Sequence, residues 1–370
     1  MTERTGPRVL CAPDKLRGAL DARGAAHALA EGARAAGGVP HELPIADGGE
    51  GTLDAFLDGA TVHELTVEDA LGRPRSARLL ELADAPDPAT AAGGTFLVEA
   101  AEAVPLHALA EHERDVERAS SYGAGELVRA ALDRGARRIL IAVGGVATVD
   151  GGAGALQALG ARCPRDGAGL LAAPEIDRSD LDPRLAGVEI ELLVDVAAPL
   201  TGPDGAAHRF GPQKGATPEQ IAALDSALTR WADALGIDPA TPGAGAAGGL
   251  GAAFQAIGAR TVAGADAVLE LTGFDTLLAE ADLVLTAEGS VDASTLQGKA
   301  VAAVVAHCAK AGVPVEVFGG RVIDEAAVEL RRRGARDVRP LGPAGRPLAE
   351  AFAAAADELA AAAEAATRRT

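Results

Sequence analysis

Short apolar segments alternate with longer Ala-rich segments towards both ends of the chain. The short segments have the length of buried strands, and the longer ones have the length and composition of helices. Strands are predicted at 8–12, 282–286 and 313–318, and helices at about 20–37, 296–311 and 347–367. Strands that alternate with helices in this way are typical of a parallel sheet covered on both faces. The two ends of the chain therefore predict a Rossmann-like α/β domain.

The middle of the chain has a different pattern. Extended segments at 61–67, 75–82 and 95–98 follow one another without a helical segment between them, and a polar Pro/Ala loop is expected near 83–94. Successive strands of this kind predict a mixed or antiparallel sheet, because antiparallel strands need only short connections.

The predicted fold class is therefore α/β with two domains. A discontinuous Rossmann-like domain is formed by 1–65 and 275–370, and an α/β domain with a mixed sheet is inserted at 66–274. A length of 370 residues is sufficient for two separate cores. We expect the active site in the cleft between the two domains, since such clefts are preferred ligand sites.

The composition argues against several classes of protein. A net charge of −19 and an aromatic content of 2% disfavour binding to nucleic acid or to an anionic membrane. There is no run of about 18 apolar residues that would span a bilayer, and the N-terminus lacks the apolar region of a signal peptide. Cys11, Cys163 and Cys308 have no metal-ligand spacing. We expect a cytoplasmic enzyme, and the sequence leaves open whether it is a monomer or a homodimer.

Asp-Gly-Gly occurs twice, at Asp47–Gly49 and at Asp150–Gly152, and each copy is predicted to lie between a strand and a helix. Glycine lets the backbone come close to a ligand, and the start of the next helix offers free N–H groups to a phosphate. An adjacent Asp can ligate Mg²⁺ or accept a proton. The two loops together suggest a site for a phosphorylated ligand.

Lysine is rare in this chain. The four lysines are Lys15, Lys214, Lys299 and Lys310, against thirty Arg, and both Lys214 and Lys299 lie next to glycine. A compact ammonium on a flexible stem can follow a phosphoryl group during its transfer. The alternative is that Lys214 and Lys299 are ordinary surface residues.

Several acids follow predicted strands. Glu288 and Asp292 come after the strand at 282–286, and Asp195 ends the apolar segment at 188–194. Ligands of open α/β sheets bind at this edge, where the acids could hold Mg²⁺, orient the substrate or act as a general base. The alternatives are that Asp292 caps the next helix and that Asp195 is hydrogen-bonded to its own loop.

The loop after the first strand carries Asp14, Lys15 and Arg17. Arg17 suits the carboxylate of a small anionic substrate because a guanidinium and a carboxylate can form two parallel hydrogen bonds; the alternative is a set of solvated loop charges. No Walker A motif is present. Gly243, Gly245 and Gly248 fit G-x-G-x-x-G, but close helix packing explains them better than nucleotide binding.

The chain resembles the type I glycerate kinases almost from end to end. The motifs that carry the resemblance are APD at 12–14, ADGGEGT at 46–52, SYGAGEL at 121–127, GG at 144–145 with DGGAG at 150–154, FGPQKGAT at 210–217, PGAGAAGGLG at 242–251 and G-K at 298–299. The resemblance implies a two-domain α/β fold and a phosphotransferase that uses ATP and Mg²⁺ to phosphorylate D-glycerate, with 2-phosphoglycerate as the usual product.

The chemistry of phosphoryl transfer, which needs positioning and charge neutralisation, suggests roles for the candidate residues. The ATP phosphates are expected against Asp47, Gly48, Gly49, Gly51, Gly144, Gly145, Asp150, Gly151 and Gly152, with Mg²⁺ contacted by Asp47, Asp150 and Glu288. Lys214 and Lys299 would neutralise the transferring group. Asp14, Arg17 and Glu288 would hold the substrate, and either Asp195 or Asp292 would deprotonate the attacking hydroxyl.

The first loop, DKLRG at 14–18, departs from the DSFKG that the family commonly has, and five further positions lose a polar or charged group. Polar groups that the family commonly has are absent at Val146, Val149, Ala197 and Ala198, and an Arg is replaced by Ser290. A pocket that recognises a small hydroxy acid discriminates through its polar groups. Two alternatives to phosphorylation of D-glycerate therefore stay open: a kinase of another hydroxy acid or polyol, and a catalytically silent ligand-binding relative.

Overall fold

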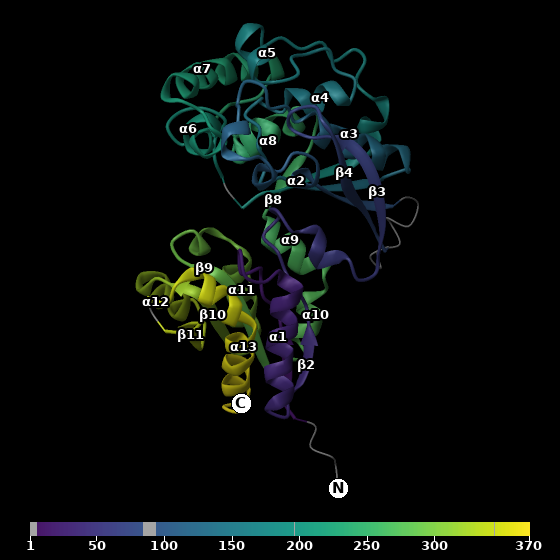
Figure 1. Cartoon of the computed structure of the whole chain (residues 1–370). Helices are drawn as coiled ribbons and strands as arrows, with labels where there is room; N and C mark the ends of the chain where they lie inside the picture. Colours follow the sequence, from purple (N-terminus) through teal and green to yellow (C-terminus); the bar gives the residue numbers. More distant parts are fainter. Residues whose placement is uncertain (1–5, 84–93, 196, 344) are drawn as a thin grey trace. The chain divides into compact units, whose positions relative to one another are not determined.

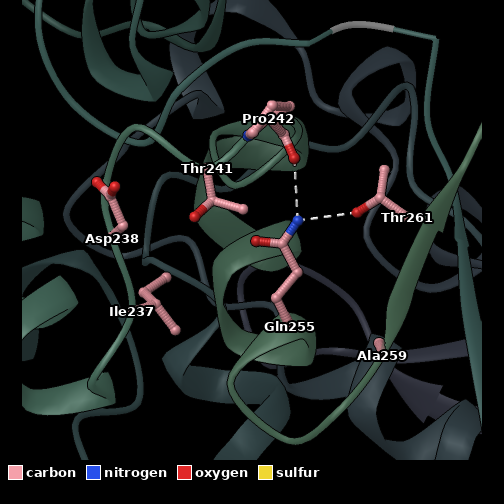
Figure 2. Close-up of a pocket in the computed structure, with 7 residues that line it drawn as sticks. All are labelled: Ile237, Asp238, Thr241, Pro242, Gln255, Ala259 and Thr261. Carbon is pink, nitrogen blue, oxygen red and sulfur yellow. Dashed lines mark hydrogen bonds between the residues drawn. The ribbon is translucent and has the colours of Figure 1, made fainter.

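The computed structural model describes residues 6–83, 94–195, 197–343 and 345–370 (Figure 1). The chain separates into two compact units. Unit 1 comprises the chain up to Asp47 together with Ala263–Thr370, and unit 2 comprises Gly48–Val262. Both units contain a sheet and helices, so the predicted α/β class is confirmed.

The sheet of unit 1 has five parallel strands in the order β11-β10-β9-β1-β2. The strands are β1 (Arg8–Cys11), β2 (Val39–Glu42), β9 (Leu283–Val291), β10 (Val315–Val322) and β11 (Asp337–Pro340). Its helices are α1 (Ala22–Ala35), α9 (Gly264–Leu271), α10 (Phe274–Leu278), α11 (Ala300–Ala311), α12 (Asp324–Arg332) and α13 (Leu348–Thr367). An all-parallel sheet of this kind is the expected Rossmann-like arrangement.

The direction in which the chain runs across this sheet reverses between β1 and β9. From β1 the chain passes through α1 to β2 on one side, whereas from β9 it passes through α11 to β10 and then through α12 to β11 on the other. Connections that leave in opposite directions open a crevice outside the carboxyl ends of the two central strands, where open α/β sheets bind ligands.

One face of this sheet is covered by α1 and α13, which lie side by side (Figure 1). Their contact is very close at Gly32 of α1. A Cβ built on Gly32 would lie 1.9 Å from the carbonyl oxygen of Ala360 and 2.9 Å from Cβ of Ala363. Small residues, abundant in both helices, therefore allow the two backbones to touch.

Unit 2 contains a six-stranded mixed sheet in the order β3-β4-β5-β6-β7-β8. The strands are β3 (Ala60–Glu68), β4 (Pro74–Leu82), β5 (Thr95–Glu99), β6 (Arg138–Ala142), β7 (Glu189–Leu193) and β8 (Arg260–Val262). The first three pair antiparallel and the remaining pairs are parallel, as expected. Most of the Pro/Ala loop predicted near 83–94 lies outside the described residues.

The helices of unit 2 are α2 (Ala100–Ala103), α3 (Tyr122–Asp133), α4 (Ala153–Ala158), α5 (Gly167–Ala172), α6 (Ala206–Phe210), α7 (Pro218–Leu235) and α8 (Leu250–Gln255). The G-x-G-x-x-G segment precedes α8. A Cβ on Gly245 would lie 2.0 Å from the oxygen of Pro199, and one on Gly248 would lie 1.9 Å from the oxygen of Thr148. These glycines therefore serve close packing, as predicted.

The two compact units divide the chain at 47/48 and 262/263, whereas the sequence places domain boundaries at 65/66 and 274/275. The latter remain a prediction about domains. None of the described helices is long and apolar enough to cross a membrane.

We predict that Gly32→Ala destabilises the protein by about 1–3 kcal/mol, because the new methyl group overlaps backbone atoms of α13. Thermal unfolding measures the effect. Gly24→Ala is the matched control in the same helix, because its Cβ would meet only side chains, at 3.1 Å or more; the helix propensity of Ala makes this change neutral or stabilising. Equal transition temperatures for the two variants would contradict the prediction.

Candidate active site

Carboxylates and lysines gather at the carboxyl ends of β1 and β9 in unit 1. The backbone N–H of Asp14 donates to the carbonyl oxygen of Ala287 at 2.9 Å, which places Asp14 beside Glu288. The segment that leads to Asp47 is joined to the same loop, since the N–H of Ile45 donates to Pro13 at 3.0 Å. Asp14, Asp47 and Glu288 therefore meet at the crevice between the two central strands.

The surroundings of two carboxyl groups in this cluster, those of Asp14 and Glu288, disfavour their ionisation. Burial raises the pKa of Asp14, and repulsion from Asp47 raises it further. Burial also raises the pKa of Glu288, whose exposed fraction is 6%, and the charge of Asp14 adds to the effect. The ammonium of Lys299 opposes both shifts.

Lys299 is the residue that precedes α11, a helix of 12 residues. The first N–H groups of a helix have no partner within it and carry a partial positive charge. Lys299 and the start of α11 therefore place positive charge beside Asp14 and Glu288, in an arrangement suited to a phosphate.

Asp292 holds the turn between β9 and α11. Its Oδ1 accepts hydrogen bonds from the hydroxyl of Ser294 at 2.6 Å and from the N–H of Ser294 at 2.8 Å, and its Oδ2 accepts from Ser290 at 3.1 Å. The bond from the Ser294 hydroxyl is the main cause of a lowered pKa of Asp292. Thr295, in the short helix η7 (Thr295–Gln297), donates to Glu288 at 2.7 Å.

Arg17 is exposed on the loop that follows β1. Its backbone lies against β9, because a Cβ built on Gly289 would come within 3.0 Å of the nitrogen of Arg17. Unit 1 thus brings together six of the candidates: Asp14, Arg17, Asp47, Glu288, Asp292 and Lys299.

The remaining candidates belong to unit 2, where two glycine loops touch. A Cβ on Gly144 would lie 2.7 Å from Cα of Gly49, and one on Gly145 would lie 2.9 Å from Cβ of Glu50. The loop at 48–53, which contains Gly48, Gly49 and Gly51, is held by Glu99. The two oxygens of Glu99 accept from the N–H groups of Gly51 at 2.8 Å and of Leu53 at 3.0 Å.

The second Asp-Gly-Gly lies in the interior of unit 2. Asp150 is fully buried and accepts hydrogen bonds from Ser121, Gly152 and Gly154. A Cβ on Gly151 would lie 2.5 Å from the ring of Trp231, and one on Gly152 would lie 2.4 Å from Cβ of Ala253. Burial raises the pKa of Asp150, and the bonds from Ser121 oppose that shift.

Lys214 is also interior, with an exposed fraction of 3%. Its Nζ donates to the carbonyl oxygen of Thr148 at 2.7 Å. Burial lowers the pKa of Lys214 to about 7, although the charge of Asp150 acts in the opposite direction. Lys214 therefore braces the segment from Thr148 to Asp150.

Asp195 lies two residues beyond β7 and is half-buried. It belongs to unit 2, whereas the rival candidate for the base, Asp292, belongs to unit 1. That the two groups of candidates share a cleft remains a prediction.

Glu99, Ser121 and Thr295 contact candidate residues but were not singled out from the sequence. A signal for Glu99 existed, since it ends the apolar segment TFLVE just as Asp195 ends another strand. Ser121 lies in the family motif SYGAGEL. The sequence offers no comparable signal for Thr295, whose partner Glu288 is defined only by the folded turn.

A model of the glycerate kinase family matches residues 9–370. The chain is 38% identical to the glycerate kinase of Bacillus subtilis (strain 168), over 95% of this chain and 94% of that protein. It is 36% identical to the glycerate 2-kinase of Escherichia coli (strain K12), over 95% of both.

The chain belongs to the glycerate kinase family.

The fold agrees with this membership. The crystal structure of a Salmonella typhimurium LT2 protein described as glycerate kinase 2 superimposes with a TM-score of 0.83, at 35% identity and with 98% of each chain covered. The resemblance found in the motifs is thereby confirmed, and the protein is a kinase. Within the described ranges, no group of three or more His, Cys, Asp or Glu residues is arranged to hold a metal ion by itself.

We predict that Lys214 makes the stability of the protein pH-dependent. Between pH 7 and the ordinary lysine pKa of 10.5, the unfolded chain holds the proton that the folded chain has lost. The contribution of Lys214 to stability must therefore rise with pH in this window. The difference in unfolding free energy between wild type and Lys214→Met should grow by up to a few kcal/mol between pH 7 and 10.

Lys310→Met is the control, because Lys310 is exposed at the end of α11. Its difference from wild type should stay constant over the same range. A constant difference for Lys214→Met as well would show that the ammonium of Lys214 is not desolvated.

Proposed function

We propose that this protein transfers the γ-phosphoryl group of ATP to D-glycerate and forms 2-phosphoglycerate. The observation that carries the proposal is the cluster in unit 1. Two carboxylates with raised pKa values, a third carboxylate, a lysine and a helix N-terminus share the topological switch point of a parallel sheet. Phosphoryl transfer needs this kind of positioning and charge neutralisation more than covalent help.

The roles within unit 1 follow from charge and position. Lys299 stabilises the charge of the transferring group, assisted by the first N–H groups of α11. Arg17, exposed on the loop after β1, holds the carboxylate of the acceptor. Asp14 and Glu288 orient the acceptor from the floor of the crevice.

The chemistry of the carboxylates fits Mg²⁺. Oxygen ligands suit this ion, which in kinases is commonly held by one or two carboxylates together with phosphate oxygens. Asp47 and Glu288 would hold it, beside Asp14. Bound Mg²⁺ supplies charge neutralisation for the phosphates. Asp150 fits this role less well, because four hydrogen bonds from Ser121, Gly152 and Gly154 already satisfy its oxygens inside unit 2.

Unit 2 supplies the glycine loops. Gly48, Gly49 and Gly51, together with Gly144 and Gly145, suit close approach of ATP phosphates, and Gly145 is exposed. Asp150, Gly151, Gly152 and Lys214 support these loops from within. For the general base, Asp195 suits the role better than Asp292, since the lowered pKa of Asp292 makes it a weak proton acceptor.

Three of the five departures from the family pattern do not argue against glycerate as the acceptor. Val146 and Val149 are packed in the two hydrophobic cores of unit 2, and Ala198 is buried. Their apolar side chains therefore fill the interior and do not line an acceptor pocket. The exposed Ala197 and the half-buried Ser290 are the two departures that are consistent with a changed acceptor pocket.

We predict that purified protein with Mg²⁺ and ATP releases ADP when D-glycerate is added, and that ³¹P NMR places the phosphate on the 2-hydroxyl. A panel of other hydroxy acids and polyols provides the comparison. A better acceptor than glycerate would favour a changed pocket at Ala197 and Ser290. Nucleotide binding without any phosphorylated product would favour a silent relative.

We predict that Lys299→Ala lowers kcat by at least about a hundredfold, the range for losing one charge-stabilising contact. The fold should persist, because Lys299 is half-buried at the start of α11. Lys310→Ala, at the exposed end of the same helix, should keep wild-type turnover. Near-normal turnover of Lys299→Ala would remove this lysine from the mechanism.

A further inference from the structure

The side chain of Arg17 projects from a tight turn. The carbonyl oxygen of Leu16 accepts hydrogen bonds from the N–H groups of Ala19 at 2.8 Å and of Leu20 at 3.0 Å, and the N–H of Leu16 donates to Leu20 at 2.9 Å. Gly18 follows Arg17 with φ +85°, a conformation that favours glycine at the third position of such a turn. These hydrogen bonds fix the local conformation of the turn. The place of Arg17 on unit 1 depends in addition on the elements against which the turn packs.

Phe352 of α13 contacts this turn from one side. A Cβ built on Gly18 would lie 2.9 Å from both Cε2 and Cζ of Phe352, so the ring lies directly against Gly18. The exposed fraction of Phe352 is 40%, whereas five of the other six phenylalanines are buried and Phe210 is half-buried. A large aromatic side chain that stays exposed calls for a reason other than core packing.

The turn also contacts strand β9. The absence of a side chain at Gly289 lets the nitrogen of Arg17 come within 3.0 Å of the position that a Cβ would occupy. Gly289 is adjacent to Glu288, a member of the carboxylate cluster. The turn that carries Arg17 is therefore packed between β9 on the cluster side and the ring of Phe352.

We propose that Phe352 is a positioning residue for the acceptor: it holds the turn 16–19 against β9 and so fixes the guanidinium of Arg17. This inference rests on the proposed function, in which Arg17 holds the carboxylate of D-glycerate. Phe352 itself contacts neither substrate. Its effect on the reaction passes entirely through Arg17.

The first test is steady-state kinetics of Phe352→Ala. KM for D-glycerate should rise about tenfold, since a misplaced binding group loses affinity readily, while kcat and KM for ATP change less than about twofold. Leu348→Ala is the matched control. Leu348 lies one turn earlier on α13 and is 72% exposed, and its removal should leave all three constants unchanged.

The second test separates positioning from general loosening of α13. In an Arg17→Ala background, Phe352→Ala should add less than about a twofold change to KM, because two residues that act through one contact are not additive. A full additional tenfold rise in that background would overturn the proposal. So would an unchanged KM in the single variant Phe352→Ala.

The third test needs no turnover. Gly18→Ala introduces both an unfavourable φ and an overlap with the ring of Phe352. Its cost in thermal stability should be smaller in the Phe352→Ala background, where only the unfavourable φ remains. Equal costs in both backgrounds would refute the contact between the ring and the turn. Absence of glycerate phosphorylation by wild type would instead contradict the proposed function, and leaves this test of the contact intact.

Discussion

Burial of carboxylates at the carboxyl ends of β1 and β9, together with the repulsion between them, is the constraint on which the chemistry of unit 1 depends. The raised pKa values of Asp14 and Glu288 mean that the folded chain resists their ionisation. A carboxyl group whose pKa is raised on folding lowers stability as the pH rises from the pKa of the unfolded state to the pKa of the folded state. Such a cluster costs stability near neutral pH, and a bound cation or a neighbouring Lys299 offsets that cost. Groups with this signature are concentrated at functional sites.

Buried charges have a different purpose in unit 2. The oxygens of Glu99 and Asp150 accept hydrogen bonds from backbone N–H groups, and Nζ of Lys214 donates to a backbone oxygen. Each of these side chains therefore fixes the conformation of a loop. Hydrogen-bonded polar groups in the interior define a unique structure, because leaving any partner unsatisfied is expensive. Rigid glycine loops and a charged crevice are thus built by separate means in the two units.

The sequence was informative where local pattern decides the structure. The alternation of strands and helices predicted the parallel sheet, and acids after strands predicted the cluster around Glu288. The interior position of Asp150–Gly152 could not be predicted, because a glycine with positive φ serves ligand approach and close packing equally well. The residue that decides between them is Trp231, about eighty positions away, whose indole N–H donates to Gly151 at 2.9 Å. Lys214 likewise could not be distinguished from a surface lysine, because its partner Thr148 is also distant in the sequence.

A long family motif therefore overstates the number of residues that can touch a ligand. Between Gly144 and Gly154, Gly144 is half-buried, Gly145 is exposed and all the others are buried. Most of this segment shapes the interior that holds the two accessible glycines in place. Substitution of polar groups by Val146 and Val149 then changes packing within unit 2 and leaves the accessible surface of the loop unaltered. Family membership and an altered motif are compatible for this physical reason.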